Sequence, residues 1–282
     1  MLHQSDIINR ELMKLSNVFS RRNRILLAEL VRTDFKLRYQ GSALGYVWSI
    51  LNPLLLFAIL YVVFVYFLGI GKGIPHYPVY LLLGIIFWRF FTEATNNGLN
   101  AIVARGALIR KIHFPHYIIV VSGTISSLIN LSINMLVVLL FIVLNGVQLT
   151  WMSLLVIPLI LELYAFALAL AFFLSAVNVK FRDVGYLWEV FLQAAFYATP
   201  IIYPITLVVE KSAIIAKIII LSPVAQVIQD ARYVLVTNTA VTPTSLLGHK
   251  LIDLIPIAII VSTIVIAALY FKKKSVRFAE DV

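Results

Sequence analysis

Long apolar runs separated by short polar segments dominate the chain. Six stretches reach the roughly 20 mainly apolar residues that a helix needs to cross the hydrocarbon core of a bilayer. They are residues 46–68, 78–98, 118–144, 152–178, 186–205 and 251–271. The pattern therefore predicts an all-α integral membrane fold, with residues 1–282 as a single transmembrane domain and residues 46–271 as its six-span core.

A seventh apolar run, 206–222, differs from these six. It contains three charged residues and lies between Pro204 and Pro223. We therefore expect an interfacial or re-entrant helical segment before the last span, within a long outer connection at 206–250.

The basic residues lie mainly on one side of the predicted spans. Seventeen Lys and Arg fall in the N-terminal segment, in the two short loops near 104–117 and 179–185, and in the C-terminal tail, against five on the opposite side. Because cytoplasmic loops carry an excess of Lys and Arg, both termini are predicted to be cytoplasmic.

Residues 24–40, before the first span, have an amphipathic pattern. On a helix of 100° per residue, the leucines share one half-circle with Val31 and Phe35, while the charged side lies opposite. Asp34 and Arg38 interrupt the apolar side, but they are four residues apart with the acid first, the favourable order for an intrahelical pair. Two interpretations stay open. The helix is a plain membrane-surface anchor, or its basic residues meet an anionic lipid headgroup. The candidates for that contact are Arg32, Lys36 and Arg38.

Few ionisable residues lie within the spans, and each is a functional candidate because burying a charge in the bilayer costs free energy. Arg89 and Glu93 are four residues apart in the second span and are expected to neutralise each other. Glu162 has no basic neighbour in its own span. It is expected to be protonated, hydrogen-bonded to another helix, or facing water.

Three spans carry polar or aromatic residues along one face. The third span has a stripe of small and polar residues, typical of close helix packing: Gly123, Ser127, Asn130 and Asn134. Two other faces suit either packing or a hydrated pathway for sugar rings, since aromatic side chains combine flat apolar surfaces with a polar group. These pathway candidates are Phe57, Tyr61 and Phe64 in the first span and Tyr186, Glu189, Gln193, Phe196 and Tyr197 in the fifth.

Composition narrows the class of protein. The chain is 61 % hydrophobic and only 13 % charged, and its mean hydropathy is +0.97. These values exclude a soluble enzyme and a disordered chain. There is no Cys, which excludes a disulfide scaffold and a thiolate metal site. The net charge of +10 follows from membrane orientation, so we expect membrane lipids rather than nucleic acid as partners.

The sequence also lacks the motifs of a self-contained enzyme or motor. It has no G-x-x-x-x-G-K-[ST] motif, so the chain cannot bind ATP through a P-loop. No H-E-x-x-H motif or carboxylate cluster indicates a metal or an acid–base centre, and the five His are scattered. We therefore expect neither a catalytic residue nor a cofactor in this chain.

Several segments resemble a known family. The run RRNRILLAELVRTDFKLRYQGSALGYVWSILNPLLLFAILYVVFVYFL is similar to the N-terminal part of type-2 ABC permeases that export O-antigen, capsule and teichoic acid polysaccharides. LLLGIIFWRFFTEATNNG, LIRKIHFP, VKFRDVGYLWE and FYATPIIYP follow in the family's order. Together they cover nearly the whole chain, and the likeness is strongest to Gram-positive permeases for rhamnose-rich wall polysaccharide.

This resemblance implies a permease subunit of a bacterial cytoplasmic membrane exporter. It would pair with a second copy of itself and with two ATP-binding subunits that hold ATP and Mg²⁺, and it would move a lipid-linked polysaccharide with a pyrophosphate head. By position, 25–39 resembles the family's gate helix and 108–115 a coupling helix, and the first and fifth spans of both copies would line the channel. The residues implied to couple to the ATP-binding subunits are Arg105, Arg110, Lys111 and His113, with Lys180, Arg182 and Asp183 in the second docking loop.

Two alternatives remain open. A type-2 ABC permease for drugs or lipids would share the same architecture, although the aromatic spans and the basic gate helix favour a sugar polymer. A membrane-embedded glycosyltransferase or acyltransferase is disfavoured because the sequence offers no catalytic constellation.

Overall fold

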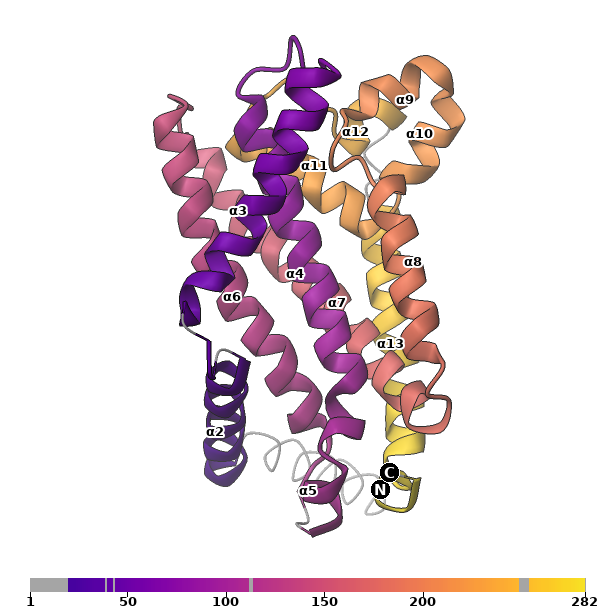
Figure 1. Cartoon of the computed structure of the whole chain (residues 1–282). Helices are drawn as coiled ribbons and strands as arrows, with labels where there is room; N and C mark the ends of the chain where they lie inside the picture. Colours follow the sequence, from indigo (N-terminus) through magenta and orange to yellow (C-terminus); the bar gives the residue numbers. More distant parts are fainter. Residues whose placement is uncertain (1–19, 39, 43, 112–113, 249–253, 282) are drawn as a thin grey trace.

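The computed structural model describes residues 20–38, 40–42, 44–111, 114–248 and 254–281, and every regular element within them is helical (Figure 1). The first half of this part of the chain contains α2 (Arg21–Arg38), η1 (Gly45–Val47), α3 (Trp48–Leu60), η2 (Tyr61–Phe67), α4 (Tyr77–Ala104), α5 (Gly106–Lys111) and α6 (Tyr117–Leu144). The second half contains η3 (Trp151–Leu155), α7 (Val156–Lys180), α8 (Val184–Ala198), α9 (Ile205–Lys211), α10 (Ala213–Ile220), α11 (Pro223–Leu235), α12 (Pro243–Leu247), α13 (Leu254–Ser275) and α14 (Phe278–Asp281).

Four helical segments of the described chain are long and apolar enough to span a bilayer. They are Gly45–Phe67, Tyr117–Leu144, Trp151–Lys180 and Leu254–Ser275, which match the predicted first, third, fourth and sixth spans. A fifth is reached if α10 and α11, which are bent by 92°, are counted as one broken span. The all-α membrane fold is confirmed, whereas the count of six is not.

The other two predicted spans also form helices, but neither has both the length and the hydropathy of a spanning helix, and the reason differs between them. The segment 78–98 lies in α4, which has 28 residues, but Arg89 and Glu93 reduce its hydropathy. The segment 186–205 forms α8, which has only 15 residues and ends at Ala198, because the chain becomes extended at Thr199 before Pro200 and Pro204.

Helix α4 is the centre of the molecule (Figure 1). Its first half is buried almost without interruption from Val79 to Trp88, and it packs mainly against α6 and α7. Gly98 allows the close approach of α7, since a Cβ atom built there would lie 2.2 Å from the Cβ atom of Ala171. Such small-residue contacts bring membrane helices together where apolar burial alone gives little driving force.

The end of the molecule opposite α5 is formed by the run of short helices α9 to α12 (Figure 1). The predicted segment 206–222 is helical, as expected, but it is divided at Ser212, whose side chain caps α10 by accepting a hydrogen bond from the Ile215 N–H. Pro223 then begins α11 in the N1 position that suits proline. The sharp bend between α10 and α11 agrees with a broken or re-entrant segment.

The C-terminal tail packs against the α5 end of the molecule instead of leaving it. Phe278 of α14 is fully buried, in ring contact with Phe271 and His116 at centroid distances of 5.4 and 5.8 Å. Burial lowers the pKa of His116 below its usual value, and a backbone hydrogen bond involving Ser275 opposes this effect. This docked tail was not predicted from the sequence.

Candidate functional site

A groove of about 630 Å³ lies between α4 and α8. Helix α3 contributes Leu56 to its wall. The other residues of the wall include polar and aromatic side chains from both helices: Ile85, Trp88, Arg89, Thr92, Glu93 and Asn96 from α4, and Glu189, Leu192, Gln193, Phe196 and Tyr197 from α8. The groove thus brings together the ionisable residues of the second predicted span and the polar face of the fifth.

Aromatic contacts and one hydrogen bond hold α8 beside α4. The Trp188 Nε1–H donates to Thr95 Oγ1 at 3.2 Å. Trp188 also meets Phe91 edge to face, with ring centroids 6.4 Å apart, and Phe196 lies 6.0 Å from Trp88. These contacts occupy the side of α8 that packs on α4. The polar face of α8 is therefore directed toward the groove and the outside of the chain.

The predicted pathway residues of α8 divide between the groove and its surroundings. Glu189, Gln193, Phe196 and Tyr197 line the groove. Tyr186 is exposed but does not contribute to the groove wall. The predicted shared face thus brings four of the five residues into one groove, and their role in a pathway stays a prediction.

The three pathway candidates of the first span lie elsewhere. Phe57, Tyr61 and Phe64 are half-buried and pack against the hydrophobic core, with Phe57 and Phe141 of α6 in edge-to-face contact at 5.4 Å. In the single chain these three aromatic side chains therefore serve helix packing, which was one of the two interpretations that the sequence left open. The first span reaches the groove through Leu56 instead.

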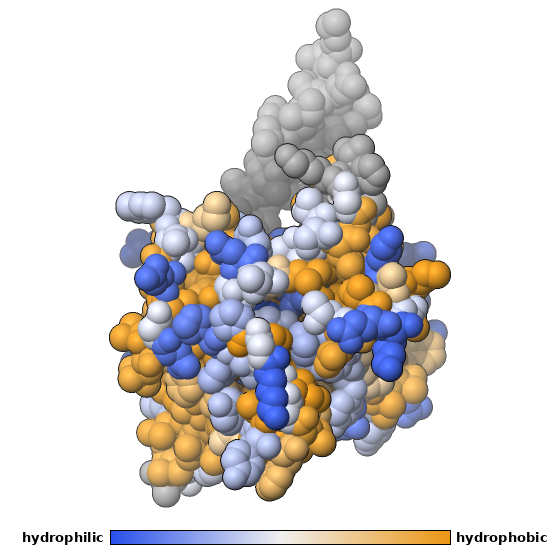
Figure 2. All heavy atoms as spheres, turned by 90° about the horizontal axis from the view of Figure 1, so that it is seen from above, coloured by the Kyte–Doolittle hydropathy of each residue, from blue (hydrophilic) through white to orange (hydrophobic). Residues whose placement is uncertain are grey.

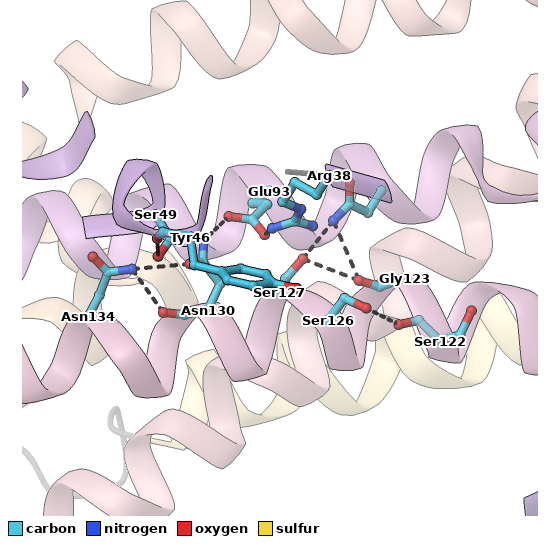
Figure 3. A network of polar contacts seen from close by, with 11 residues as sticks. Arg38, Tyr46, Ser49, Glu93, Ser122, Gly123, Ser126, Ser127, Asn130 and Asn134 are labelled. Atoms are coloured by element: carbon cyan, nitrogen blue, oxygen red, sulfur yellow. Dashed lines mark hydrogen bonds and ion pairs between the residues drawn. The ribbon is translucent and has the colours of Figure 1, made fainter. Parts of the chain in front are cut away.

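The predicted pairing of the two intramembrane charges in α4 is wrong. Arg89 Nη1 donates to Asn52 Oδ1 of α3 at 2.7 Å. Glu93 forms an ion pair with Arg38 of α2 and accepts a second hydrogen bond from Asn130 Nδ2 of α6 at 2.7 Å (Figure 3). Each charge thus has a partner on another helix, and α4 joins three neighbours through two residues.

The expected pair within α2 is likewise replaced by contacts between helices. Asp34 pairs with Arg105 at the end of α4 and accepts a hydrogen bond from Ser122 of α6 at 3.4 Å, while Arg38 pairs with Glu93. Arg38, which was predicted to meet a lipid headgroup, is therefore paired inside the chain. Arg105, which was predicted to contact the ATP-binding subunit, is also paired inside the chain.

The polar stripe of α6 is buried and serves packing, as predicted. Gly123, Ser127, Asn130 and Asn134 are all buried. Figure 3 shows this stripe lying along α4, with Asn130 directed to Glu93. The Asn134 Nδ2–H donates back to the Asn130 carbonyl oxygen at 2.8 Å, and Asn97 of α4 donates to Ser127 Oγ at 2.8 Å. The stripe fixes α6 against α4.

Glu162, the unexplained charge of the fourth span, lies against Gln226 and Asp230 of α11. Its Oε1 atom is buried and has no hydrogen-bond partner among the described residues. The sequence left three possibilities open, and contact with another helix is the one that fits this position.

The remaining headgroup candidates lie on an open face of α2. Arg32 and Lys36 are exposed and line a groove of about 900 Å³ that α2 forms with α6. Phe35 and Tyr46 stack at this groove with centroids 5.1 Å apart. The same wall includes Arg24 and one carboxylate, Glu29, so the groove combines an excess of positive charge with an aromatic surface.

The coupling candidates within the described residues lie at the α5 end of the molecule. The described helix there is Gly106–Lys111, two residues earlier than the predicted start, and His113 lies outside the described residues. The exposed residues among these candidates are Arg110, Lys111, Lys180, Arg182 and Asp183. Helix α5 and the α7–α8 loop therefore present charges suitable for docking another protein.

Arg232 of α11 is a residue that sequence reasoning missed, because it was counted as a charge of the outer connection. Its side chain is fully buried and donates to the carbonyl oxygens of Tyr80, Pro200 and Ile201 at 3.1, 2.6 and 2.7 Å. The available signal was the arginine in a short helix after Pro223 that also carries Gln226, Gln229 and Asp230. The guanidinium group satisfies carbonyl oxygens left without helical partners where α8 ends.

The described residues contain no group of three or more His, Cys, Asp or Glu that could hold a metal ion. The groove between α4 and α8 is lined by hydrogen-bonding and aromatic side chains. It suits a ligand that forms many weak interactions.

Comparison with known proteins identifies the family. Residues 26–236 match the family described as ABC-2 type transporter. The chain belongs to this family. As an ABC-2 permease it is a multi-pass membrane transport subunit rather than an enzyme, and family membership implies a partnership with an ATP-binding subunit.

Similar curated proteins share one name. The O-antigen export system permease protein RfbA of Myxococcus xanthus is 32 % identical over 67 % of this chain and 72 % of its own length. Two proteins of the same name from Klebsiella pneumoniae are 31 % and 30 % identical, each over 90 % of this chain and 94 % of their own length.

Proposed function

We propose that two copies of this chain form the membrane channel of an ATP-driven exporter that moves a lipid-linked surface polysaccharide across the bacterial cytoplasmic membrane. The observation that carries this proposal is the similarity of 90 % of the chain to permeases named for O-antigen export. The groove between α4 and α8 supports it, because its carboxylate, amide and aromatic groups suit the hydroxyl edges and C–H faces of sugar rings.

The exposure of polar groups on α8 supports a second copy. Gln193 lies midway along α8 and is exposed in the single chain, as are Glu189 and Tyr197, the latter at 67 %. Exposed amide, carboxylate and hydroxyl groups are costly in lipid, which offers them no hydrogen-bond partner. A partner copy that covers this face would enclose the groove as a hydrated passage and remove these groups from contact with lipid.

The energy for transport would come from outside the chain. The sequence lacks a P-loop, so ATP and Mg²⁺ are assigned to two ATP-binding subunits, and no cofactor is assigned to this chain. Those subunits would dock on α5 and on the α7–α8 loop, where Arg110, Lys111, Lys180, Arg182 and Asp183 are exposed. Such docking would put both termini in the cytoplasm and α9 to α12 on the outer side.

The groove beside α2 is the proposed entry point of the substrate. Arg32 and Lys36 are exposed at its wall, and two cations suit the two phosphates of a pyrophosphate-linked lipid. Phe35 and Tyr46 provide a stacking surface for the first sugar. Arg38, which pairs with Glu93, is assigned to positioning α2.

The printed names of the relatives favour O-antigen-like polysaccharide over drugs or lipids as the exported cargo. The narrower expectation of a teichoic acid or a rhamnose-rich wall polysaccharide rests on the sequence resemblance alone.

The test is deletion of the gene, followed by complementation, with surface and intracellular polysaccharide measured separately. We expect the deletion to abolish surface polysaccharide, to leave lipid-linked polysaccharide inside the cell, and to be reversed by the intact gene. The gently solubilised complex should have the mass of two copies plus two ATP-binding subunits. Unchanged surface polysaccharide, or a complex with a single copy of this chain, would contradict the proposal.

A further inference from the structure

A second cavity lies at the end of the molecule opposite α5, away from the α4–α8 groove. It has a volume of about 500 Å³ and lies between the Gly69–Ile74 loop, the start of α9 and the segment that follows α11. It adjoins a larger cavity of about 930 Å³, and the two share Thr206, Glu210, Thr239, Ala240 and Val241 in their walls. We name the two together the outer cleft. Figure 2 looks onto this end and shows hydrophilic residues spread across it among hydrophobic ones.

A buried hydrogen-bond donor belongs to the wall of this cleft. Gln229 lines the smaller cavity, yet its side chain is 0 % exposed. Its Oε1 atom accepts hydrogen bonds from Arg232 Nη1 at 2.8 Å and from the Tyr80 hydroxyl at 3.3 Å. Its Nε2 atom is buried and has no hydrogen-bond partner among the described residues.

Arg232 fixes which way this amide points. A guanidinium group only donates hydrogen bonds, so the amide atom that faces it must be the oxygen. Arg232 is itself immobilised by carbonyl oxygens at the end of α8 and by its position 3.6 Å from the centroid of the Tyr80 ring. The Gln229 amide is thus held with its N–H groups turned away from Arg232 and without an acceptor in the part of the chain that the structure describes.

The loop over the cleft has a conformation that depends on glycine. Gly69, Gly71 and Gly73 all have positive φ, at 67°, 91° and 92°, a region that other residues rarely adopt. At Gly71 an added Cβ atom would also lie 2.6 Å from the Tyr77 ring. These three positions set the path of the loop and place Lys72 in the wall of the cleft.

The chemistry of the cleft points to an uncharged, hydroxyl-rich ligand. Lys72 and Glu210 balance each other in the wall of the smaller cavity. The larger cavity adds the Asp230 carboxylate, the Tyr233 ring and several hydroxyl groups. An apolar ligand would leave the buried Gln229 N–H groups unpaired, which is unfavourable, and the carboxylates repel an anion. Sugar hydroxyls both donate and accept, and so match all of these groups.

We propose that the outer cleft is a carbohydrate-binding site that holds uncharged sugar residues of the polysaccharide after they have passed the α4–α8 groove. This inference rests on the proposed function and adds a second contact point for the same cargo. A sugar hydroxyl would accept a hydrogen bond from Gln229 Nε2, while the Glu210 carboxylate would accept from a neighbouring hydroxyl.

The test uses the full chain with its co-purifying partner in nanodiscs. The probe is the lipid-free oligosaccharide released by mild acid from the surface polysaccharide of the producing cells. Gln229→Glu keeps an oxygen for Arg232 and removes the donor, so the fold is retained while the hydrogen bond is lost. Ala240→Trp fills the shared wall of the cleft, and Ala213→Trp is its matched control, because Ala213 is exposed on α10 and lies outside the cleft.

We expect saturable binding of the oligosaccharide to the wild type and to Ala213→Trp, and about tenfold weaker binding to Gln229→Glu and Ala240→Trp. Absence of binding to the wild type, equal binding to all four proteins, or an equal loss in Ala213→Trp would each overturn the inference. Failure of the proposed function is recognised separately. In that case, deletion of the gene would leave surface polysaccharide unchanged, whatever the binding result.

Discussion

Arg38 of α2 forms an ion pair with Glu93 of α4, although 55 residues separate them in the chain. A second pair, Asp34 with Arg105, joins the same two helices. Asp34 and Arg38 are one turn apart on α2. Their partners are Glu93 within α4 and Arg105, which caps the C-terminal end of α4. The amphipathic helix is therefore attached to the central helix of the protein at two points, and its position does not depend on lipid alone.

This arrangement makes a charge-swap experiment decisive. Arg38→Glu and Glu93→Arg should each destabilise the purified protein, since either change leaves a partly buried charge beside a like charge. The double variant should recover part of the loss, giving a coupling free energy of about 1–2 kcal/mol in a double-mutant cycle of thermal unfolding. Arg32→Glu, on the exposed side of α2, is the matched control and should have little effect. Strictly additive effects of the two changes would show that the pair contributes nothing.

The helical elements followed from sequence because apolar runs and a 3.6-residue period are local properties. The pattern placed α2, the long spanning helices and the buried stripe of α6 correctly. It failed for the ionic contacts. Asp34 with Arg38, and Arg89 with Glu93, have the spacing of an intrahelical pair, but periodicity reports which residues share a face and not which helix packs on that face.

The burial of Arg232 likewise could not be predicted from local properties of the sequence. In the sequence it is a basic residue in the long connection between the fifth and last spans, and charge counting treats such a residue as solvated. The carbonyl oxygens that it binds, those of Pro200 and Ile201, lie about thirty residues earlier. They need a donor only because α8 ends at Ala198, which hydropathy did not locate, since the apolar run continues beyond this point.

Gly98 on α4 and Gly123 on α6 should respond differently to substitution by alanine. Gly98→Ala should destabilise the protein by about 1–3 kcal/mol, as expected of overpacking, because the new methyl group would overlap the Cβ atom of Ala171 at 2.2 Å. Gly123→Ala should be tolerated, since its nearest contact, the Asn97 Cβ atom, lies at 3.4 Å. Thermal unfolding of the two variants in one detergent compares them directly. Equal melting temperatures would contradict the close α4–α7 contact.

The loop between α7 and α8 should be required for docking of the ATP-binding subunit. Reversing both exposed charges, Arg182→Glu with Asp183→Lys, should abolish co-purification of that subunit while the permease remains folded. Lys273→Glu changes an exposed charge at the same end of the molecule but outside the loop, so it serves as the control and should co-purify normally. Normal recovery of the ATP-binding subunit with the loop variant would remove this loop from the docking surface.

The groove between α4 and α8 should be required for export but not for assembly. Glu189→Ala and Tyr197→Ala each remove a groove-lining group and should reduce surface polysaccharide by roughly tenfold, the effect of about 1.4 kcal/mol on a transport barrier. Val190→Ala is the matched control, because Val190 is exposed on the same helix but lies outside the groove. Wild-type amounts of surface polysaccharide in both groove variants would exclude these residues from the pathway.

Cysteine labelling tests the proposed orientation of the chain. Because the wild type has no Cys, a single substitution introduces a unique thiol. Lys211 is exposed at the end of α9, and Arg110 is exposed on α5 at the opposite end of the molecule. If the excess of basic residues on the α5 side sets the topology, a membrane-impermeant maleimide added to intact cells should label Lys211→Cys and not Arg110→Cys. Arg110→Cys should become labelled only in inverted vesicles or after permeabilisation. The reverse pattern would place the α9 to α12 region, and with it the outer cleft, in the cytoplasm. Neither export through the groove nor glycan binding at that end would then be possible as proposed.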